Sequence, residues 1–169
     1  MTKYAMRLLT TLLCAALLSP VWANYDEGLA AAQKDDYQTA FSKWKKLAED
    51  GDAKMQATLA VLYHTGQGVK KSYKKAFYWY KKAAQQGNSA AQANLGVMYA
   101  KGTGTNQDTI ESYAWYSLAA KANKDKRVGN KLWGFDTIAA QLNPKQLAQA
   151  QKLSQQYLDK YSLQKSAKK

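Results

Sequence analysis

The sequence repeats itself with a period of 36 residues. Residues 40–68 align with residues 76–104 without a gap. The residues that recur in this alignment include Ala40, Phe41, Lys45, Gly51, Gln56, Leu59, Tyr63, Gly66 and Gly68. A fixed period of about 20–50 residues is typical of solenoid proteins, in which each repeat is a small unit stacked on the next. The period therefore constrains the architecture first, and it says little about chemistry.

Each repeat is predicted to contain two helices. The apolar residues of 37–49 fall on one side of a helix, and a glycine separates them from a second apolar segment at 53–64. The same pattern returns at 73–86 and 89–101, with Ser89 as the predicted N-cap. We therefore expect an all-α chain built as an α/α solenoid of helix–turn–helix repeats.

The third repeat departs from the pattern in an informative way. Its first helix is predicted over 107–122, where Leu118 occupies the position that Lys82 has in the second repeat. An apolar residue at a solvent position predicts that another part of the chain packs there. A basic stretch at 124–131 leads into a helix that ends near Leu142.

Both ends of the solenoid are predicted to be capped by helices. Asn24–Lys34 forms the first cap, with Asn24 as its N-cap. Asn143-Pro144 is a strong start signal for the last helix. The predicted divisions are a solenoid domain at 24–163, repeats at about 37–72, 73–108 and 109–142, a capping helix at 144–163, and a basic tail at 164–169.

Residues 1–23 have the pattern of a secretory signal peptide. Lys3 and Arg7 precede an apolar run at 8–18, and cleavage is predicted after Ala23. The alternative is an uncleaved anchor, but a span needs about 20 apolar residues. Cys14 suggests a lipoprotein only weakly, because Leu13 precedes it. We expect export to the periplasm, with full secretion as the alternative, and no transmembrane segment after cleavage.

The chain is strongly basic. Its formal net charge is +13, and removal of Lys3 and Arg7 with the signal peptide leaves +11. Such a charge favours acidic partners, including anionic glycans and lipid surfaces. The alternative is that the lysines only keep the helices soluble. Nucleic acid is a weaker candidate, because an exported protein rarely meets it.

The repeat resembles a known family. Its pattern is similar to the SEL-one-like repeat (SLR), a relative of the tetratricopeptide repeat. The residues that carry the resemblance are Ala76, Trp79, Tyr80, Ala83, Ala84, Gly87, Ala91, Leu95, Gly96, Tyr99, Gly102 and Gly104. The resemblance implies a right-handed superhelix that acts as a scaffold for protein–protein contacts. Lys43 and Ala60 depart from the family pattern, which favours Trp and Gly at these positions.

The residues needed for catalysis are scarce. His64 is the single histidine, and Cys14 is lost with the signal peptide, so neither a zinc site nor a nucleophile–base pair is expected. Most acids lie at predicted helix ends, where capping explains them. The sequence predicts a protein that is not an enzyme and that needs no metal or cofactor.

The candidate binding residues lie on the first helix of each repeat, which lines the concave face of such solenoids. They are Lys43, Lys45, Tyr78, Trp79, Lys81 and Trp115. Trp79 and Trp115 are either core residues or anchors for a ligand, and the lysine pairs are either a solvated face or a binding patch. Two functions follow. The first is an envelope scaffold that binds a protein partner, and the alternative is a binder of an envelope polyanion such as an anionic glycan, lipopolysaccharide or phospholipid headgroups.

Overall fold

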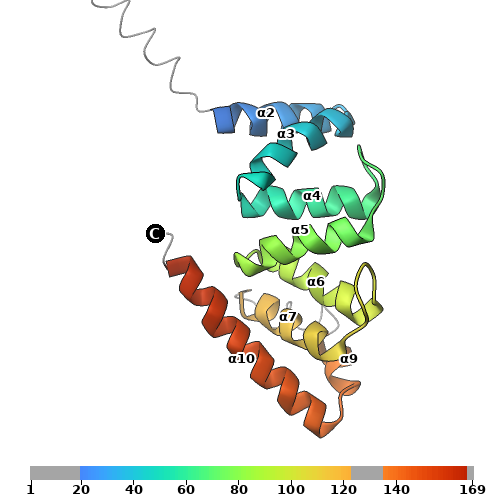
Figure 1. Ribbon diagram of the computed structural model, residues 1–169, viewed down its shortest axis with the longest axis vertical. Helices are drawn as coiled ribbons and strands as arrows, with labels where there is room; N and C mark the ends of the chain where they lie inside the picture. The colour runs from blue at the N-terminus through green and yellow to red at the C-terminus, as the bar shows by residue number, and fades with distance from the viewer. Residues whose placement is uncertain (1–19, 123–134, 167–169) are drawn as a thin grey trace, which may run out of the picture.

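The protein is a stack of helices. A computed structural model describes residues 20–122 and 135–166, and it contains no strand within these ranges. The helices are α2 (Pro20–Ala32), α3 (Tyr37–Glu49), α4 (Ala53–Thr65), α5 (Tyr73–Gln85), α6 (Ser89–Lys101), α7 (Thr109–Ala122), α9 (Phe135–Ala140) and α10 (Pro144–Ser166) (Figure 1). From α2 to α7 each helix packs on the next one in sequence, and both α9 and α10 pack on α7. The predicted all-α solenoid is confirmed.

The helix bounds agree with the predictions inside the repeats and differ at the ends. α3 and α6 begin and end at the predicted residues. α2 begins at Pro20 and not at Asn24, so Asn24 is not its N-cap. The predicted basic stretch at 124–131 and most of the predicted signal peptide lie outside the described residues.

Short polar side chains fix where each helix of the repeats begins. Asp36, Asp52, Ser72 and Asn88 each accept a hydrogen bond from the backbone N–H three residues later. This satisfies one of the N–H groups that a helix leaves unpaired in its first turn. The prediction that Ser89 is the N-cap of α6 is wrong by one residue, since Asn88 has that role.

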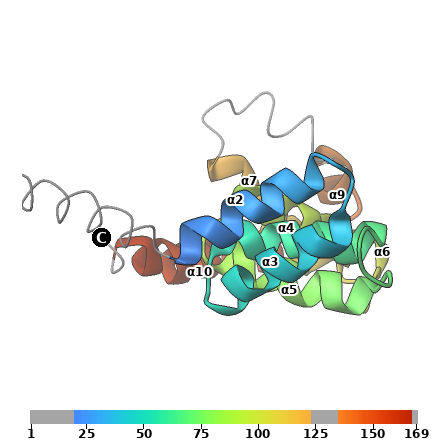
Figure 2. The ribbon, with the colours of Figure 1, turned by 90° about the horizontal axis from the view of Figure 1, so that it is seen from above.

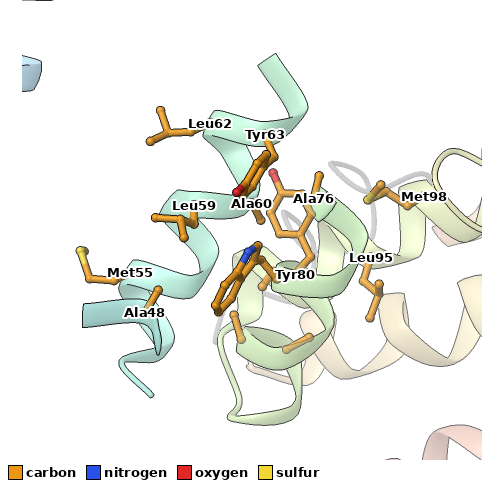
Figure 3. Close-up of a cluster of buried hydrophobic side chains, with 14 of the residues drawn as sticks. Ala48, Met55, Leu59, Ala60, Leu62, Tyr63, Ala76, Tyr80, Leu95 and Met98 are labelled. Carbon is orange, nitrogen blue, oxygen red and sulfur yellow. The ribbon is translucent and has the colours of Figure 1, made fainter. Parts of the chain in front are cut away.

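The core consists of alanines between larger side chains. Ala48, Ala60, Ala76, Ala83 and Ala84 are fully buried. Small residues let neighbouring helices approach closely, and Leu59, Tyr63, Tyr80, Leu95 and Met98 fill the spaces between layers (Figure 3). Burial of these apolar groups is what stabilises a stack in which most contacts are local.

The C-terminal helix lies across the side of the stack. Seen from above in Figure 2, the helix pairs overlie one another while the end of α10 projects to one side. α10 packs against α7, and Leu118 at this contact is only 4% exposed. The expectation that another part of the chain covers Leu118 is confirmed. Asn143 caps α10 by accepting from the backbone N–H of Gln146 at 2.9 Å.

Candidate functional site: the inner face of the solenoid

The first helices of the repeats, α3, α5 and α7, share one face of the stack, which we call the inner face. α10 covers this face at α7, in the third repeat. It remains open at α3 and α5. A pocket of about 540 Å³ lies between the first and second repeats, and another of about 620 Å³ lies over α3. The open part of the inner face is therefore the candidate binding surface.

In the third repeat the inner face is closed by a cluster of aromatic side chains. Trp115 is 1% exposed and packs against Tyr157 and Tyr161 of α10, with ring centroids 4.8 and 5.6 Å apart. The Glu111 carboxylate accepts hydrogen bonds from Trp115 Nε1 at 3.0 Å and from the Tyr157 hydroxyl at 2.9 Å. Burial, together with the Glu111 charge, raises the pKa of Tyr157 above its ordinary value. Trp115 is thus a core residue and presents no surface to a ligand.

In the second repeat the corresponding tryptophan is also buried, beneath an exposed tyrosine. Trp79 is 9% exposed, and Tyr78 beside it is 50% exposed, with the two rings 5.1 Å apart. Lys82 Nζ lies 4.9 Å from the Tyr78 ring centroid and 5.5 Å from that of Trp79. Tyr78 is the aromatic side chain of this face that is most available to a partner, while Trp79 mainly supports it from below.

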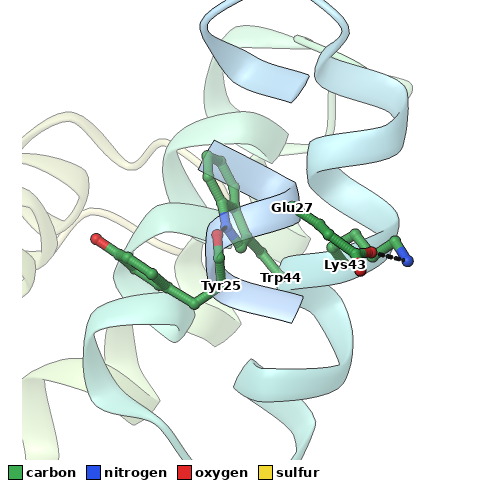
Figure 4. Close-up of polar contacts among 4 residues, drawn as sticks. All are labelled: Tyr25, Glu27, Lys43 and Trp44. Atoms are coloured by element: carbon green, nitrogen blue, oxygen red, sulfur yellow. Dashed lines mark hydrogen bonds and ion pairs between the residues drawn. The ribbon is translucent and has the colours of Figure 1, made fainter. Parts of the chain in front are cut away.

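In the first repeat the corresponding position belongs to the contact with the N-terminal helix. Lys43 forms an ion pair with Glu27 of α2 (Figure 4). The neighbouring Trp44 donates from Nε1 to the backbone oxygen of Tyr25 at 3.4 Å, and Gly28 lies against its indole ring. Lys43 borders the inner face, and through its ion pair with Glu27 it also holds α2 on α3.

The two remaining candidates are exposed lysines. Lys45 pairs with Glu49 one turn later at 3.6 Å and borders the pocket over α3. Lys81 has its Nζ 6.0 Å from the Phe77 ring and borders none of the pockets described above. Exposed i,i+4 pairs contribute only about 0.3–0.5 kcal/mol, so Lys45 can leave Glu49 for a partner at low cost.

Sequence reasoning did not single out the residues around the opening between the first two repeats. Lys82, Gln85 and Gln86 of α5 line it together with Lys160 and Tyr161 of α10. The sequence held one signal for this site, the match of Lys82 with Leu118. The contribution of α10 had no such signal, because Lys160 lies 78 residues from Lys82 along the chain and outside the repeat.

His64 lies near the end of α4. The ring of His64 packs edge-on against Tyr73 at 5.2 Å, and burial, with Lys71 and Lys101 nearby, lowers the pKa of His64. Within 20–122 and 135–166 no three potential metal-binding side chains gather at one place. None of the helices in those ranges has the length and hydropathy that crossing a bilayer requires.

The fold and its inner face define a solenoid of tandem helix pairs. The Sel1 repeat family matches residues 53–88 and 89–124. The SEL-one-like resemblance is thereby confirmed, since the chain contains two Sel1 repeats within an SLR-type fold. Proteins of this family are generally scaffolds for protein–protein contacts and are typically not enzymes.

Two solved structures resemble the chain closely. One is a protective antigen with an SLR fold from uropathogenic Escherichia coli strains, with 32% identity over 88% of this chain and a TM-score of 0.76. The other is a Sel1 repeat protein from Oxalobacter formigenes, with 32% identity over 79% of this chain and a TM-score of 0.61. The chain spans 32% of the length of the first and 55% of the second. No curated protein sequence matches the chain.

Proposed function

We propose that this chain is an interaction scaffold of the bacterial cell envelope that binds a protein partner through the open part of its inner face. The observation that carries the proposal is the contrast along that face. In the third repeat it holds the helix α10 through Trp115, Tyr157 and Tyr161, whereas in the first two repeats it is open. A surface that already binds one helix in this fold is suited to bind another.

The proposed location of the protein is the periplasm, with secretion as the alternative. It rests on the signal-peptide pattern of residues 1–23. Cleavage after Ala23 would shorten α2 by its first turn, but the contacts that hold α2 on α3 come from Tyr25, Glu27 and Gly28. The N-terminal cap therefore fits a processed chain. The N-terminal residue of the protein recovered from the periplasm tests this, and a chain that still begins at Met1 would contradict it.

The partner is tested by capture from envelope extract on the immobilised protein, washed first at low and then at high salt. We expect a discrete protein that survives high salt with the wild-type chain. Tyr78→Ser should release it, while Val61→Ser should not. Both side chains are exposed, at 50% and 42%, but Val61 lies on α4, the second helix of its repeat.

A second function, binding of an anionic envelope polymer, is favoured by one specific observation. The described residues form only two ion pairs, Lys43–Glu27 and Lys45–Glu49, which leaves Lys46, Lys74, Lys75, Lys81 and Lys82 of α3 and α5 without a carboxylate partner there. Polyanion binding falls steeply with salt. Glycan or lipid that is released as salt rises, with no protein retained, would favour this function over the scaffold.

A further inference from the structure

The inner face contains the same pocket twice. The first inter-repeat pocket lies between the first and second repeats and is lined by Gly51, Gln56, Lys82, Gln85 and Gln86. Each of these residues has a counterpart 36 positions later, and all five counterparts line the second inter-repeat pocket. The two pockets are therefore equivalent sites of the solenoid, one repeat apart.

α10 occupies the second inter-repeat pocket. Tyr157, Leu158 and Tyr161 of α10 form its outer wall, and the space that remains is about 190 Å³. The first pocket has about 540 Å³, and α10 reaches only its edge, with Lys160 and Tyr161. Gln85 Nε2 donates to the Tyr161 hydroxyl at 3.4 Å at this edge. The structure thus shows how a helix with aromatic residues one turn apart enters this type of pocket.

The chemistry of the two pockets differs at one wall. Leu118 faces α10 in the second pocket, and Lys82 takes the equivalent place in the first. Lys160 brings a second ammonium group to the first pocket, and no carboxylate of the described residues forms an ion pair with either lysine. Asp50 is the single acid of this lining. The pocket therefore favours an occupant that is aromatic like α10 but carries carboxylates where α10 is apolar or basic.

This charge argues against the α10 helix of a second copy as the occupant. Residues 144–166 contain four lysines and one aspartate, so that helix is basic. It would bring ammonium groups next to Lys82 and Lys160, and like charges at close range are unfavourable. A protein with an acidic segment has the complementary charge.

We propose that the first inter-repeat pocket docks an acidic helix of a protein partner, whose aromatic side chain enters between the repeats while its carboxylates pair with Lys82 and Lys160. The proposal rests on the scaffold function above and specifies its partner. Aromatic anchors in pockets commonly dominate the energy of an interface, and charged pairs at the rim give specificity.

A defined peptide tests the pocket directly. The probe copies residues 150–161 of α10, with Lys152→Glu and Lys160→Glu, and carries a fluorescent label. The control peptide keeps the native sequence of that segment. Fluorescence anisotropy with the purified full chain should show that the acidic probe binds at least about tenfold more tightly than the control, the usual effect of one charge-assisted contact. Equal binding of the two peptides would overturn the proposal.

Two charge reversals of the protein locate the site. Lys82→Glu should weaken binding of the acidic probe about tenfold or more, whereas Lys81→Glu should change it less than about twofold. The two lysines are adjacent and both exposed on α5, and the variants have equal net charge, but Lys81 does not line the pocket. Circular dichroism checks that both variants keep the wild-type helicity. Equal losses of probe affinity in the two variants would indicate general attraction to a basic surface and would contradict the proposed docking site.

The same variants separate this proposal from the proposed function. A salt-resistant partner that is captured by wild type and by Lys81→Glu, but lost with Lys82→Glu, supports both. A partner captured by all three proteins leaves the scaffold function intact and places its contact outside this pocket. Capture of no protein by wild type contradicts the scaffold function. The peptide experiment alone then tests whether the pocket docks an acidic helix.

Discussion

Gln86 donates a hydrogen bond from Nε2 to Oε1 of Gln56 at 2.8 Å, which joins the first repeat to the second. Gln56 in turn donates from its own Nε2 to the backbone oxygen of Ala48 at 3.0 Å. The next repeat conserves only half of this chain of contacts. Gln92 donates to the oxygen of Ala84 at 3.1 Å, but its Oε1 is buried without a partner among the described residues, because Ala122 stands where Gln86 would recur.

Ala122→Gln is therefore expected to stabilise the protein. The new amide can reach Gln92 Oε1 through the second inter-repeat pocket, which both residues line. One hydrogen bond to a buried acceptor contributes about 1 kcal/mol to the free energy of unfolding. Thermal or urea unfolding followed by circular dichroism measures the change.

Ala122→Glu is the matched control, since its ionised carboxylate has nearly the same shape but has no hydrogen to donate. It should give no gain. A rise of equal size in both variants would mean that side-chain volume, and not the hydrogen bond, is responsible.

Leu118→Lys tests how α10 is held on the inner face. Leu118 is 4% exposed beneath α10, so a lysine there would bury an unpaired ammonium group. The expected loss is about 3 kcal/mol or more in the free energy of unfolding, with earlier proteolytic cleavage of α10.

The reciprocal change, Lys82→Leu, should alter stability by less than about 0.5 kcal/mol, because Lys82 is exposed. If both exchanges had the same small effect, α10 would not depend on the apolar contact at this position.

Much of the fold could be predicted because the information is local and repeated. Glycines after each helix and capping residues before it mark the bounds of α3 and α6 in the sequence itself. The register of Leu118 with Lys82 also predicted that some segment covers the third repeat. These signals depend only on neighbouring residues or on comparison between repeats.

The candidate site could be predicted only in part, because it depends on contacts between distant segments. Lys43 aligns with Trp79, but the sequence holds no sign that Glu27 would pair with it. Trp115 aligns equally well and is buried because Tyr157 and Tyr161 pack on it from α10. Two tyrosines spaced one turn apart in a terminal helix give the same sequence pattern in both cases. The pattern therefore does not distinguish a helix that caps the stack from one that fills its inner face.

Gly68→Ala tests the close approach between the loop after α4 and the start of α3 within the first repeat. Gly68 has a positive φ of 67°, and a Cβ there would collide with the backbone oxygen of Tyr37. The substitution should lower the free energy of unfolding by about 1–3 kcal/mol beyond the effect of strain alone. Gly51→Ala gives the effect of strain, since Gly51 also has a positive φ, of 104°, but has no atom within 4 Å of the added Cβ. Equal losses in the two variants would rule out the collision as the cause.

His64 should make stability depend on pH. Its Nδ1 is buried without a partner in the described part of the chain. Burial, and to a smaller extent the positive charges of Lys71 and Lys101, lowers the pKa of His64 below the ordinary value of 6.5. Below pH 6.5 the unfolded chain therefore takes up a proton on His64 more readily than the folded chain does. The contribution of neutral His64 to the free energy of unfolding is complete above that pH and is lost as the pH falls. We expect the melting temperature to decrease as the pH falls from 7 to 5.

His64→Phe keeps a ring against Tyr73 and should flatten the dependence of the melting temperature on pH in this window, because phenylalanine does not titrate. Carboxylates that titrate below pH 5 affect both proteins alike, so the difference between the two profiles isolates His64, and parallel profiles would show that its protonation is not coupled to folding.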